Sequence, residues 1–103
     1  MISRHWTGVS KPGKSGDYIL HLKNVTFNNL KKITGFISAQ ILQRDTEEGV
    51  EFLVITNWDN VDSIKQFAGN DFELAVVPKL VQDILLKYDK KVKHFDVTYE
   101  VSF

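Results

Sequence analysis

Residues 36–58 read FISAQILQRDTEEGVEFLVITNW, and this stretch decides the fold that we expect. Its two ends, Phe36–Arg44 and Val50–Trp58, are rich in β-branched and aromatic residues, which favour strands. The residues between them, Asp45–Gly49, are polar and end in glycine, as a short hairpin loop does. The two segments are therefore predicted to pair as antiparallel strands.

The chain before this hairpin follows one strand pattern and one helix pattern. Ile2–Val9 mixes β-branched and aromatic residues and is stopped by the turn-forming cluster Ser10–Gly13, which predicts a first strand. Gly16–Lys31 spaces its apolar residues as a helix does, and Ser15 is placed to cap that helix.

The chain after the hairpin predicts two helices and a last strand. A short helix is expected to start at a cap formed by Asp59 or Asn60 and to end at Gly69. A longer one begins at Pro78 and continues its apolar stripe through Tyr88. Val92–Phe103 alternates apolar and polar residues, which predicts a half-buried edge strand.

The predicted order is strand, helix, strand, strand, two helices, strand, which is the split βαβ or ferredoxin-like arrangement. The expected fold class is therefore α+β, with a four-stranded antiparallel sheet and helices on one of its faces. In this topology the first and third strands are central. Residues 1–103 are predicted to form a single domain, because this length is about one domain and no linker, repeat or low-complexity tract interrupts it.

Both faces of the predicted sheet are apolar, which favours a homodimer. On one strand Phe52 and Val54 point one way, while Leu53 and Ile55 point the other. Leaving several such side chains in water forfeits roughly 1.5–3 kcal/mol each, and a second copy of the sheet is the simplest cover. The alternative is a monomer whose twist, loops and long polar side chains cover the second face.

The composition excludes several partners and chemistries. Thirteen Lys and Arg residues balance thirteen Asp and Glu residues, so we expect neither nucleic acid nor a membrane surface as a partner. There is no cysteine, and no histidine or carboxylate cluster has metal-ligand spacing, so we expect no metal and no cofactor. No stretch approaches the ~20 apolar residues that span a bilayer, and the opening residues lack a secretory signal, so a cytoplasmic protein is expected.

An ordered set of segments resembles the antibiotic biosynthesis monooxygenase superfamily. The segments are Ile33–Arg44, Val50–Asp59, Phe67–Gly69, Ala75–Pro78 and His94–Val97. Members of this superfamily are dimeric α+β barrels, in which two ferredoxin-like sheets pack face to face. The resemblance therefore implies the same assembly here.

The superfamily includes quinol oxygenases that use neither metal nor flavin, and heme-degrading oxygenases. The resemblance implies a cofactor-independent monooxygenase that acts on a small aromatic or quinol-like molecule. In such an enzyme the substrate supplies the electrons, once a base has made it an electron-rich anion beside dioxygen. The alternative is a non-catalytic homodimer of the same fold that binds a ligand or serves as an accessory module.

Aromatic residues are the candidates for substrate binding. Trp58 matches the tryptophan that these oxygenases place against their substrate, and Asn57 is adjacent to it but is expected to point to the opposite face. Trp6, Phe67 and Phe72 are candidates for the walls of an aromatic pocket. The alternative for all four aromatic residues is an ordinary place in the core or in an interface.

The chain departs from the superfamily pattern at three places. Val54 stands four residues before Trp58, where the aromatic oxygenases carry an asparagine. Ala75–Pro78 occupies the region in which the heme-degrading branch carries a histidine. The first-strand asparagine of that branch has no match, since His5 and Trp6 occupy its neighbourhood.

Histidines are the candidates for a catalytic base. His94 and Asp96 lie two apart on one predicted strand, a spacing that lets a carboxylate orient an imidazole, although we expect that face to be exposed to solvent. His5 is next to Trp6 on a predicted central strand, from which it can enter a pocket. His21 is expected to be a partly buried packing residue of the first helix.

Overall fold

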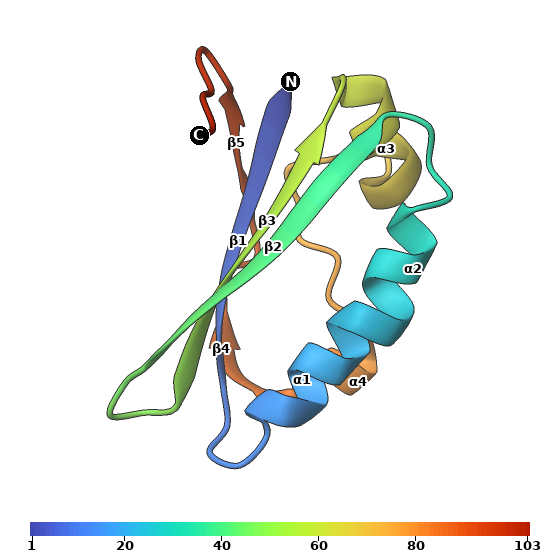
Figure 1. The fold of residues 1–103 in the computed structure, drawn as a ribbon. Helices are drawn as coiled ribbons and strands as arrows, with labels where there is room; N and C mark the ends of the chain where they lie inside the picture. Colours follow the sequence, from blue (N-terminus) through green and yellow to red (C-terminus); the bar gives the residue numbers. More distant parts are fainter.

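An antiparallel sheet covered on one face by helices forms the fold, in a computed structural model that describes residues 1–103. Figure 1 shows all the helices on one side of the sheet and the other side uncovered. The predicted α+β class is confirmed. In chain order the elements are β1 (Ile2–Ser10), α1 (Ser15–His21), the π-helical turn η1 (Leu22–Thr26), α2 (Phe27–Leu30), β2 (Phe36–Asp45), β3 (Val50–Trp58), α3 (Val61–Ala68), α4 (Lys79–Ile84), β4 (Leu85–Tyr88) and β5 (Lys93–Asp96).

The sheet has the order β2-β3-β1-β4, and β5 also pairs with β1. Strands β1 and β3 are therefore central, as predicted. They pair antiparallel along their whole length, from Ile2 opposite Trp58 to Ser10 opposite Val50. The predicted hairpin is also present, because β2 pairs with β3 along its length, with a register irregularity between Phe36 and Ser38.

The helix that was predicted from Pro78 through Tyr88 is shorter than expected. Helix α4 starts at Lys79 and ends at Ile84, and Leu85–Tyr88 continues as β4 beside the end of β1. The apolar spacing fitted a longer helix, so the prediction was wrong here. The edge of β1 offers backbone hydrogen-bonding groups that must be paired, and this pairing overrides the local helical pattern.

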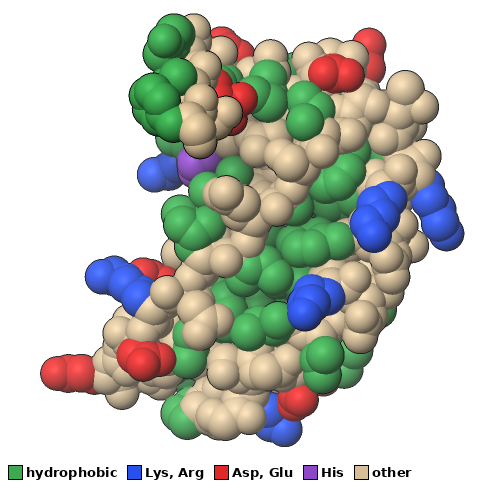
Figure 2. Space-filling model, viewed as in Figure 1, with side chains coloured by type: hydrophobic (Ala, Val, Ile, Leu, Met, Phe, Trp, Pro, Cys, Tyr) green, Lys and Arg blue, Asp and Glu red, His purple; other side chains and the backbone are tan.

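The last predicted strand is also shorter, because β5 covers only Lys93–Asp96. Asp96 lies opposite Ile2, the first residue of β1, and the N–H group of Val97 donates to the carbonyl of Met1. Beyond this point the described residues provide no strand to pair with. The alternating residues that follow are consequently exposed, Tyr99 at 82%. Figure 2 shows hydrophobic side chains gathered on this C-terminal tail.

The first helical segment runs without a break through α1, η1 and α2, but its middle turn is π-helical. There the N–H group of Phe27 donates to the carbonyl of Leu22, five residues earlier. Ser15 is the first helical residue of α1 and makes no side-chain cap, so that detail of the prediction was wrong. Helix α3 has the expected ends: Oδ1 of Asn60 accepts a hydrogen bond from the N–H group of Ser63, and Gly69 has a φ of 85°.

The core between sheet and helices consists of two separate clusters. The larger is centred on Tyr18 of α1 and Phe52 of β3, with rings in an edge-to-face contact at 5.0 Å. The smaller comprises Leu30, Trp58 and Ile64. The two clusters meet at Phe27, which is partly buried and packs against both.

Candidate functional site

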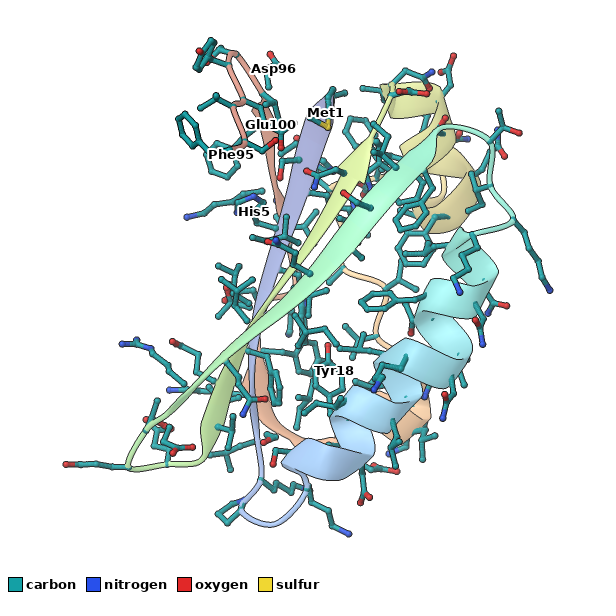
Figure 3. All side chains as sticks on the ribbon, in the orientation of Figure 1. Met1, His5, Tyr18, Phe95, Asp96 and Glu100 are labelled. Carbon is teal, nitrogen blue, oxygen red and sulfur yellow. The ribbon has the colours of Figure 1, made fainter.

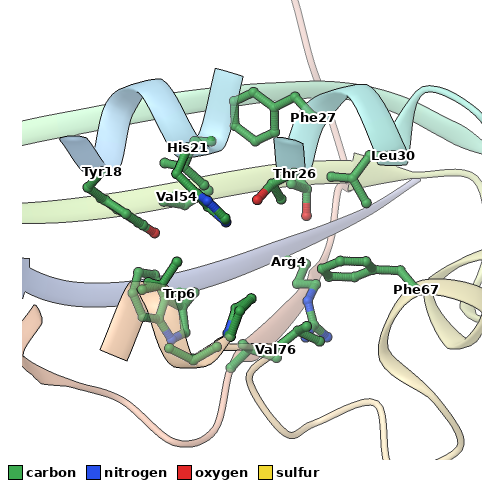
Figure 4. Close-up of a pocket in the computed structure, with 16 residues that line it drawn as sticks. Arg4, Trp6, Tyr18, His21, Thr26, Phe27, Leu30, Val54, Phe67 and Val76 are labelled. Carbon is green, nitrogen blue, oxygen red and sulfur yellow. The ribbon is translucent and has the colours of Figure 1, made fainter. Parts of the chain in front are cut away.

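A cavity of about 70 Å³ lies between the helical layer and the sheet, where the two core clusters meet. Figure 4 shows residues from α1, η1 and α2 above it and from β1 and the coil before α4 below it. Its walls are mostly apolar, and a few polar groups converge on it. The lining residues are Arg4, Trp6, Tyr18, His21, Leu22, Thr26, Phe27, Leu30, Val54, Thr56, Phe67, Val76, Val77, Pro78, Val81 and Val92.

Arg4 is the charged residue of this cavity, although it is only 5% exposed. It lies on β1 with its side chain toward the helices, between Ile2 and Trp6 on the same face. Its guanidinium donates hydrogen bonds to the carbonyls of Phe72 and Leu74. Its Cζ atom lies 5.7 Å from the centre of the Phe67 ring, a cation–π contact.

No carboxylate accompanies this buried cation. All four ion pairs of the chain lie elsewhere, on the surface. Burial lowers the pKa of Arg4 from its ordinary value of 12.5 to about 10. At neutral pH the guanidinium therefore remains charged, and its positive charge has no negative partner within the protein.

His94 of β5 is the third group that Arg4 contacts, with 3.0 Å between Nη1 of Arg4 and Nε2 of His94. Because a guanidinium can only donate, this ring nitrogen accepts and the imidazole is neutral. Burial and the charge of Arg4 lower the pKa of His94, against a smaller opposing effect of Glu73. The Phe72 ring packs edge-to-face on His94 at 5.2 Å.

Two further polar side chains of α1 line the cavity without a protein partner. The hydroxyl of Tyr18 and the ring nitrogens of His21 form no hydrogen bond within the chain. Every fully buried polar side-chain atom of the chain has a partner, so these atoms are not fully buried. The Tyr18 hydroxyl is therefore open to the cavity, as Figure 4 shows, although the residue is 3% exposed. Burial raises the pKa of Tyr18, so this hydroxyl stays protonated and can donate.

Trp6 forms the opposite wall, and its position depends on Gly8. A Cβ atom on Gly8 would lie 2.5 Å from the Trp6 ring, so the indole lies directly over the glycine. The indole Nε1 donates to the carbonyl of Asp89 at 2.9 Å, and the ring packs against Tyr18 and Tyr88 at 6.0 and 6.3 Å.

The π-helical turn η1 contributes Leu22 and Thr26 to the lining. Such turns widen a helix locally and are frequent at functional sites. Here the wide turn lies directly over the cavity, with Phe27 at its end.

Among the aromatic residues predicted for a substrate pocket, Trp6 and Phe67 line the cavity. Trp58 does not: it is 0% exposed, its Nε1 donates to Oγ1 of Thr56 at 2.9 Å, and its ring stacks on Phe67. Within the protomer Trp58 is a core aromatic, separated from the cavity by Phe67. Phe72 lies beside the cavity rather than in it, next to Arg4 and His94.

The remaining predicted residues divide between the two faces of the sheet. His5 lies on the uncovered face, where Figure 3 shows it beside Phe95; their rings are 5.0 Å apart. Asn57 also points to that face, as expected, and donates to Oγ of Ser38. His94 was expected on a solvent-exposed face, which was wrong, because its pairing with Arg4 turns it toward the helices.

Sequence reasoning missed Arg4 and Tyr18 as site residues and treated His21 only as a packing residue. For Arg4 a signal was present: a charged residue occupies the helix-facing parity of a central strand, between apolar Ile2 and Trp6. Such a position is unusual for an unpaired charge.

The fold and the site together define a class of protein: a ferredoxin-like domain that holds a small, largely apolar cavity between its helices and its sheet. No group of three or more His, Cys, Asp or Glu side chains is placed to hold a metal ion. No helix is long and apolar enough to cross a bilayer.

The chain belongs to the antibiotic biosynthesis monooxygenase family, whose model matches residues 9–76. The resemblance found in the sequence is thereby confirmed. No curated protein gives a significant match. The matched region includes α1, η1, α2 and the hairpin, whereas Arg4 and Trp6 lie before it.

Solved structures of similar fold cover almost the whole chain at low sequence identity. A protein from Bacillus cereus assigned as an antibiotic biosynthesis monooxygenase is 18% identical, with a TM-score of 0.66, over 100% of this chain and 96% of that one. A monooxygenase from Streptomyces coelicolor in complex with nanaomycin D is 13% identical, with a TM-score of 0.61, over 99% and 89%. A heme-degrading protein from Mycobacterium tuberculosis, with two hemes in its active site, is 14% identical, with a TM-score of 0.61, over 99% and 100%.

The cavity of this chain does not fit a heme. Its volume of about 70 Å³ suits at most a single aromatic ring, whereas a porphyrin carries four pyrrole rings in one plane. In Ala75–Pro78, where the heme-degrading branch carries a histidine, the last three residues form an apolar wall here. Heme chemistry is therefore no part of the proposed function.

Proposed function

We propose that this chain is a cofactor-independent monooxygenase that acts on a small aromatic or quinol-like molecule bound between its helices and its sheet. The observation that carries the proposal is the cavity itself, in which aromatic walls surround a buried cation and two unpaired polar groups of α1. Membership of the monooxygenase family supports it. The fold shared with a monooxygenase in complex with nanaomycin D agrees with it.

The proposed reaction uses dioxygen as its only oxidant. A phenol that reacts with one dioxygen molecule gives a quinone and one water molecule. One oxygen atom becomes the new carbonyl, and the other leaves as water with the hydrogens of the C–H and O–H bonds. The step that the protein must assist is removal of the phenolic proton, because the resulting anion transfers electrons to dioxygen more readily.

Three side chains of the cavity have the chemistry for this step. His21 is the imidazole of the lining and has free ring nitrogens, so we assign it as the proton acceptor. Arg4 stabilises the negative charge that develops on the substrate oxygen. Tyr18 donates its hydroxyl proton to orient the ring. His5 and His94, the bases expected from the sequence, are less well placed, since His5 lies on the other face and Nε2 of His94 is engaged by Arg4.

The experiment is oxygen consumption with and without enzyme, using two single-ring phenols with a free para C–H bond, 2-methylphenol and 2,6-dimethylphenol, as probes. We expect a rate above the uncatalysed oxidation that falls by about 10²-fold or more in His21→Gln, the usual size of a general-base effect. His5→Gln is the matched control and keeps the wild-type rate. An equal loss in both variants, or no rate above background with either probe, overturns the proposal.

The second candidate is a non-catalytic domain of the same fold that binds a ligand. Val54 favours it, because this apolar residue lines the cavity where the aromatic oxygenases carry an asparagine. A probe that raises the melting temperature of the protein but causes no oxygen uptake supports this candidate over the enzyme.

The homodimer is part of the same proposal. On the uncovered face Leu53 and Ile55 are only partly buried, and Phe95 is 50% exposed. The apolar residues of the tail, among them Tyr99 and Val101, add to this surface. Exposed apolar side chains on a sheet face are of the kind that marks an interface. Sedimentation velocity at tens of micromolar protein is expected to give a dimer, and a single monomer species at every concentration contradicts it.

A further inference from the structure

The donors of Arg4 that the protein does not use point to the chemical class of the ligand. A guanidinium has five N–H donors. Nη1 has two partners, the carbonyl of Phe72 and Nε2 of His94, and Nη2 has one, the carbonyl of Leu74. Nε has none. Two N–H groups therefore remain, one of them on Nε.

The Nε donor is accessible. No fully buried polar side-chain atom of the chain lacks a hydrogen-bond partner, so Nε must border open space even though Arg4 is 5% exposed. The open space that Arg4 lines is the cavity. Figure 4 shows the guanidinium at its floor, beside Phe67.

The rest of the molecule leaves this charge without compensation. No carboxylate lies within ion-pair distance of Arg4, and the partners that it has are neutral carbonyls and a neutral imidazole. The carbonyls hold the guanidinium in place but do not neutralise it. A buried cation without a counter-ion is costly to maintain, and an anion from outside would remove that cost.

We propose that the ligand of this cavity is a small aromatic anion, a carboxylate or an ionised phenol, whose acidic oxygens accept the two unused N–H groups of Arg4 while its ring lies among Trp6, Tyr18 and Phe67. This rests on the proposed function only in placing the ligand in the same cavity. Two N–H donors on a fixed guanidinium match the two oxygens of a carboxylate. Arg4 lies outside the part of the chain that the family model matches, so this assignment comes from the structure of this chain.

The test compares two probes of equal shape and different charge, benzoate and benzamide, by calorimetric titration. In the wild-type protein we expect benzoate to bind at least tenfold more tightly. Arg4→Gln is expected to reduce this ratio to near one, whereas Arg4→Lys keeps part of it because the charge remains without the paired donors. Arg44→Gln is the matched control, since the only other arginine of the chain is an exposed residue paired with Glu51. It leaves the ratio unchanged.

Arg4 also holds the carbonyls of Phe72 and Leu74, so its removal can weaken the fold. A measurement on the wild-type protein keeps the proposal falsifiable. The chain has two arginines, and their Nε–H signals are separable by NMR. Benzoate is expected to shift one of these signals, the one that disappears in Arg4→Lys, and benzamide is not. Equal affinity for the two probes in the wild-type protein, or a benzoate-induced shift confined to Arg44, overturns the proposal.

The experimental results that would overturn this inference differ from those that would overturn the proposed function. Selective binding of benzoate at Arg4 without oxygen uptake from either oxidation probe supports the inference and overturns the monooxygenase. Oxygen uptake that is neither inhibited by benzoate nor changed in a folded Arg4→Gln variant overturns the inference and leaves the monooxygenase in place.

Discussion

Strand β3 presents similar apolar residues to its two sides, but their surroundings differ. Phe52 and Trp58 point toward the helices and are fully buried. Leu53 and Ile55, which alternate with them, point to the uncovered face and are only partly buried. The covered face also holds a cavity and an arginine without a counter-ion, whereas the uncovered face mixes these apolar residues with polar neighbours such as His5, Thr7 and Gln40. The apolar content of a strand therefore does not show which of its two sides holds the site. The elements that cover each side show it.

The largest effect should come from the covered face. Trp58→Ala removes a side chain that is 0% exposed and contacts Phe36 and Phe67. We expect it to lower the free energy of unfolding by about 3–5 kcal/mol, measured by urea denaturation. Leu53→Ala on the uncovered face is the comparison and should cost about 1 kcal/mol in the single protomer, because that residue is already partly exposed there. An equal loss of unfolding free energy in the two variants would contradict the difference in burial between the two faces.

The uncovered face should instead determine association. Ile55→Asp places a charge in the centre of the proposed interface and is expected to give a monomer in sedimentation velocity, with its secondary structure intact by circular dichroism. Leu20→Asp is the control, since Leu20 is a similarly apolar residue, 56% exposed, on α1. Dissociation by both variants, or by neither, would show that this face is not the interface.

A smaller effect on the covered face separates the shape of the cavity from the stability of the core. Gly8→Ala places a methyl group against the Trp6 ring, and we expect a loss of about 1–3 kcal/mol with a changed tryptophan emission spectrum. Gly16→Ala in α1, where an added Cβ meets nothing within 4 Å, should be neutral or stabilise by up to about 1 kcal/mol. A Gly8→Ala variant with wild-type stability and emission would contradict the close contact.

The smallest effect concerns pH. Burial lowers the pKa of His94 below its ordinary value of 6.5, so the unfolded state takes up the proton first as pH falls through that value. Stability is therefore fully present above about pH 6.5 and decreases below it, until the folded state is protonated as well. Arg4 opposes protonation and Glu73 partly favours it.

We expect the melting temperature to fall by a few degrees between pH 7 and pH 5, and the fall to be smaller in His94→Gln. Burial lowers the pKa of His5 too. The variant His5→Gln therefore measures how much of the fall in melting temperature comes from the histidine on the uncovered face. A melting temperature that does not change over this range in the wild-type protein would show that neither ring is held neutral.

The hairpin and the central strands could be predicted because local and tertiary preferences agree there. Val50–Trp58 is β-rich, flanked by a polar loop, and pairs on both sides, so nothing competes with the strand. The C-terminal third could not be predicted, because long-range strand pairing determines its secondary structure. Leu85–Tyr88 leaves a helical pattern to pair with β1, and β5 ends where β1 begins.

The candidate site could be predicted only in part. Trp6 and Phe67 were found because aromatic residues on core-facing positions are natural walls. Arg4 was missed although its place between Ile2 and Trp6 indicated a buried charge, because the sequence does not show that no carboxylate lies beside it. Trp58 was favoured from the resemblance, and the structure places Phe67 between it and the cavity.

The π-helical turn over the cavity bears on which changes in chain length the protein can tolerate. A single residue removed from an ordinary helix rotates everything after it by about 100°, which would carry Phe27 and Leu30 out of the core. A π turn already contains one residue more than an α-helical turn needs. Loss of a residue such as Asn24 would therefore convert the segment to a regular helix with both side chains still in phase. The fold would survive such a deletion, and the roof of the cavity would become narrower.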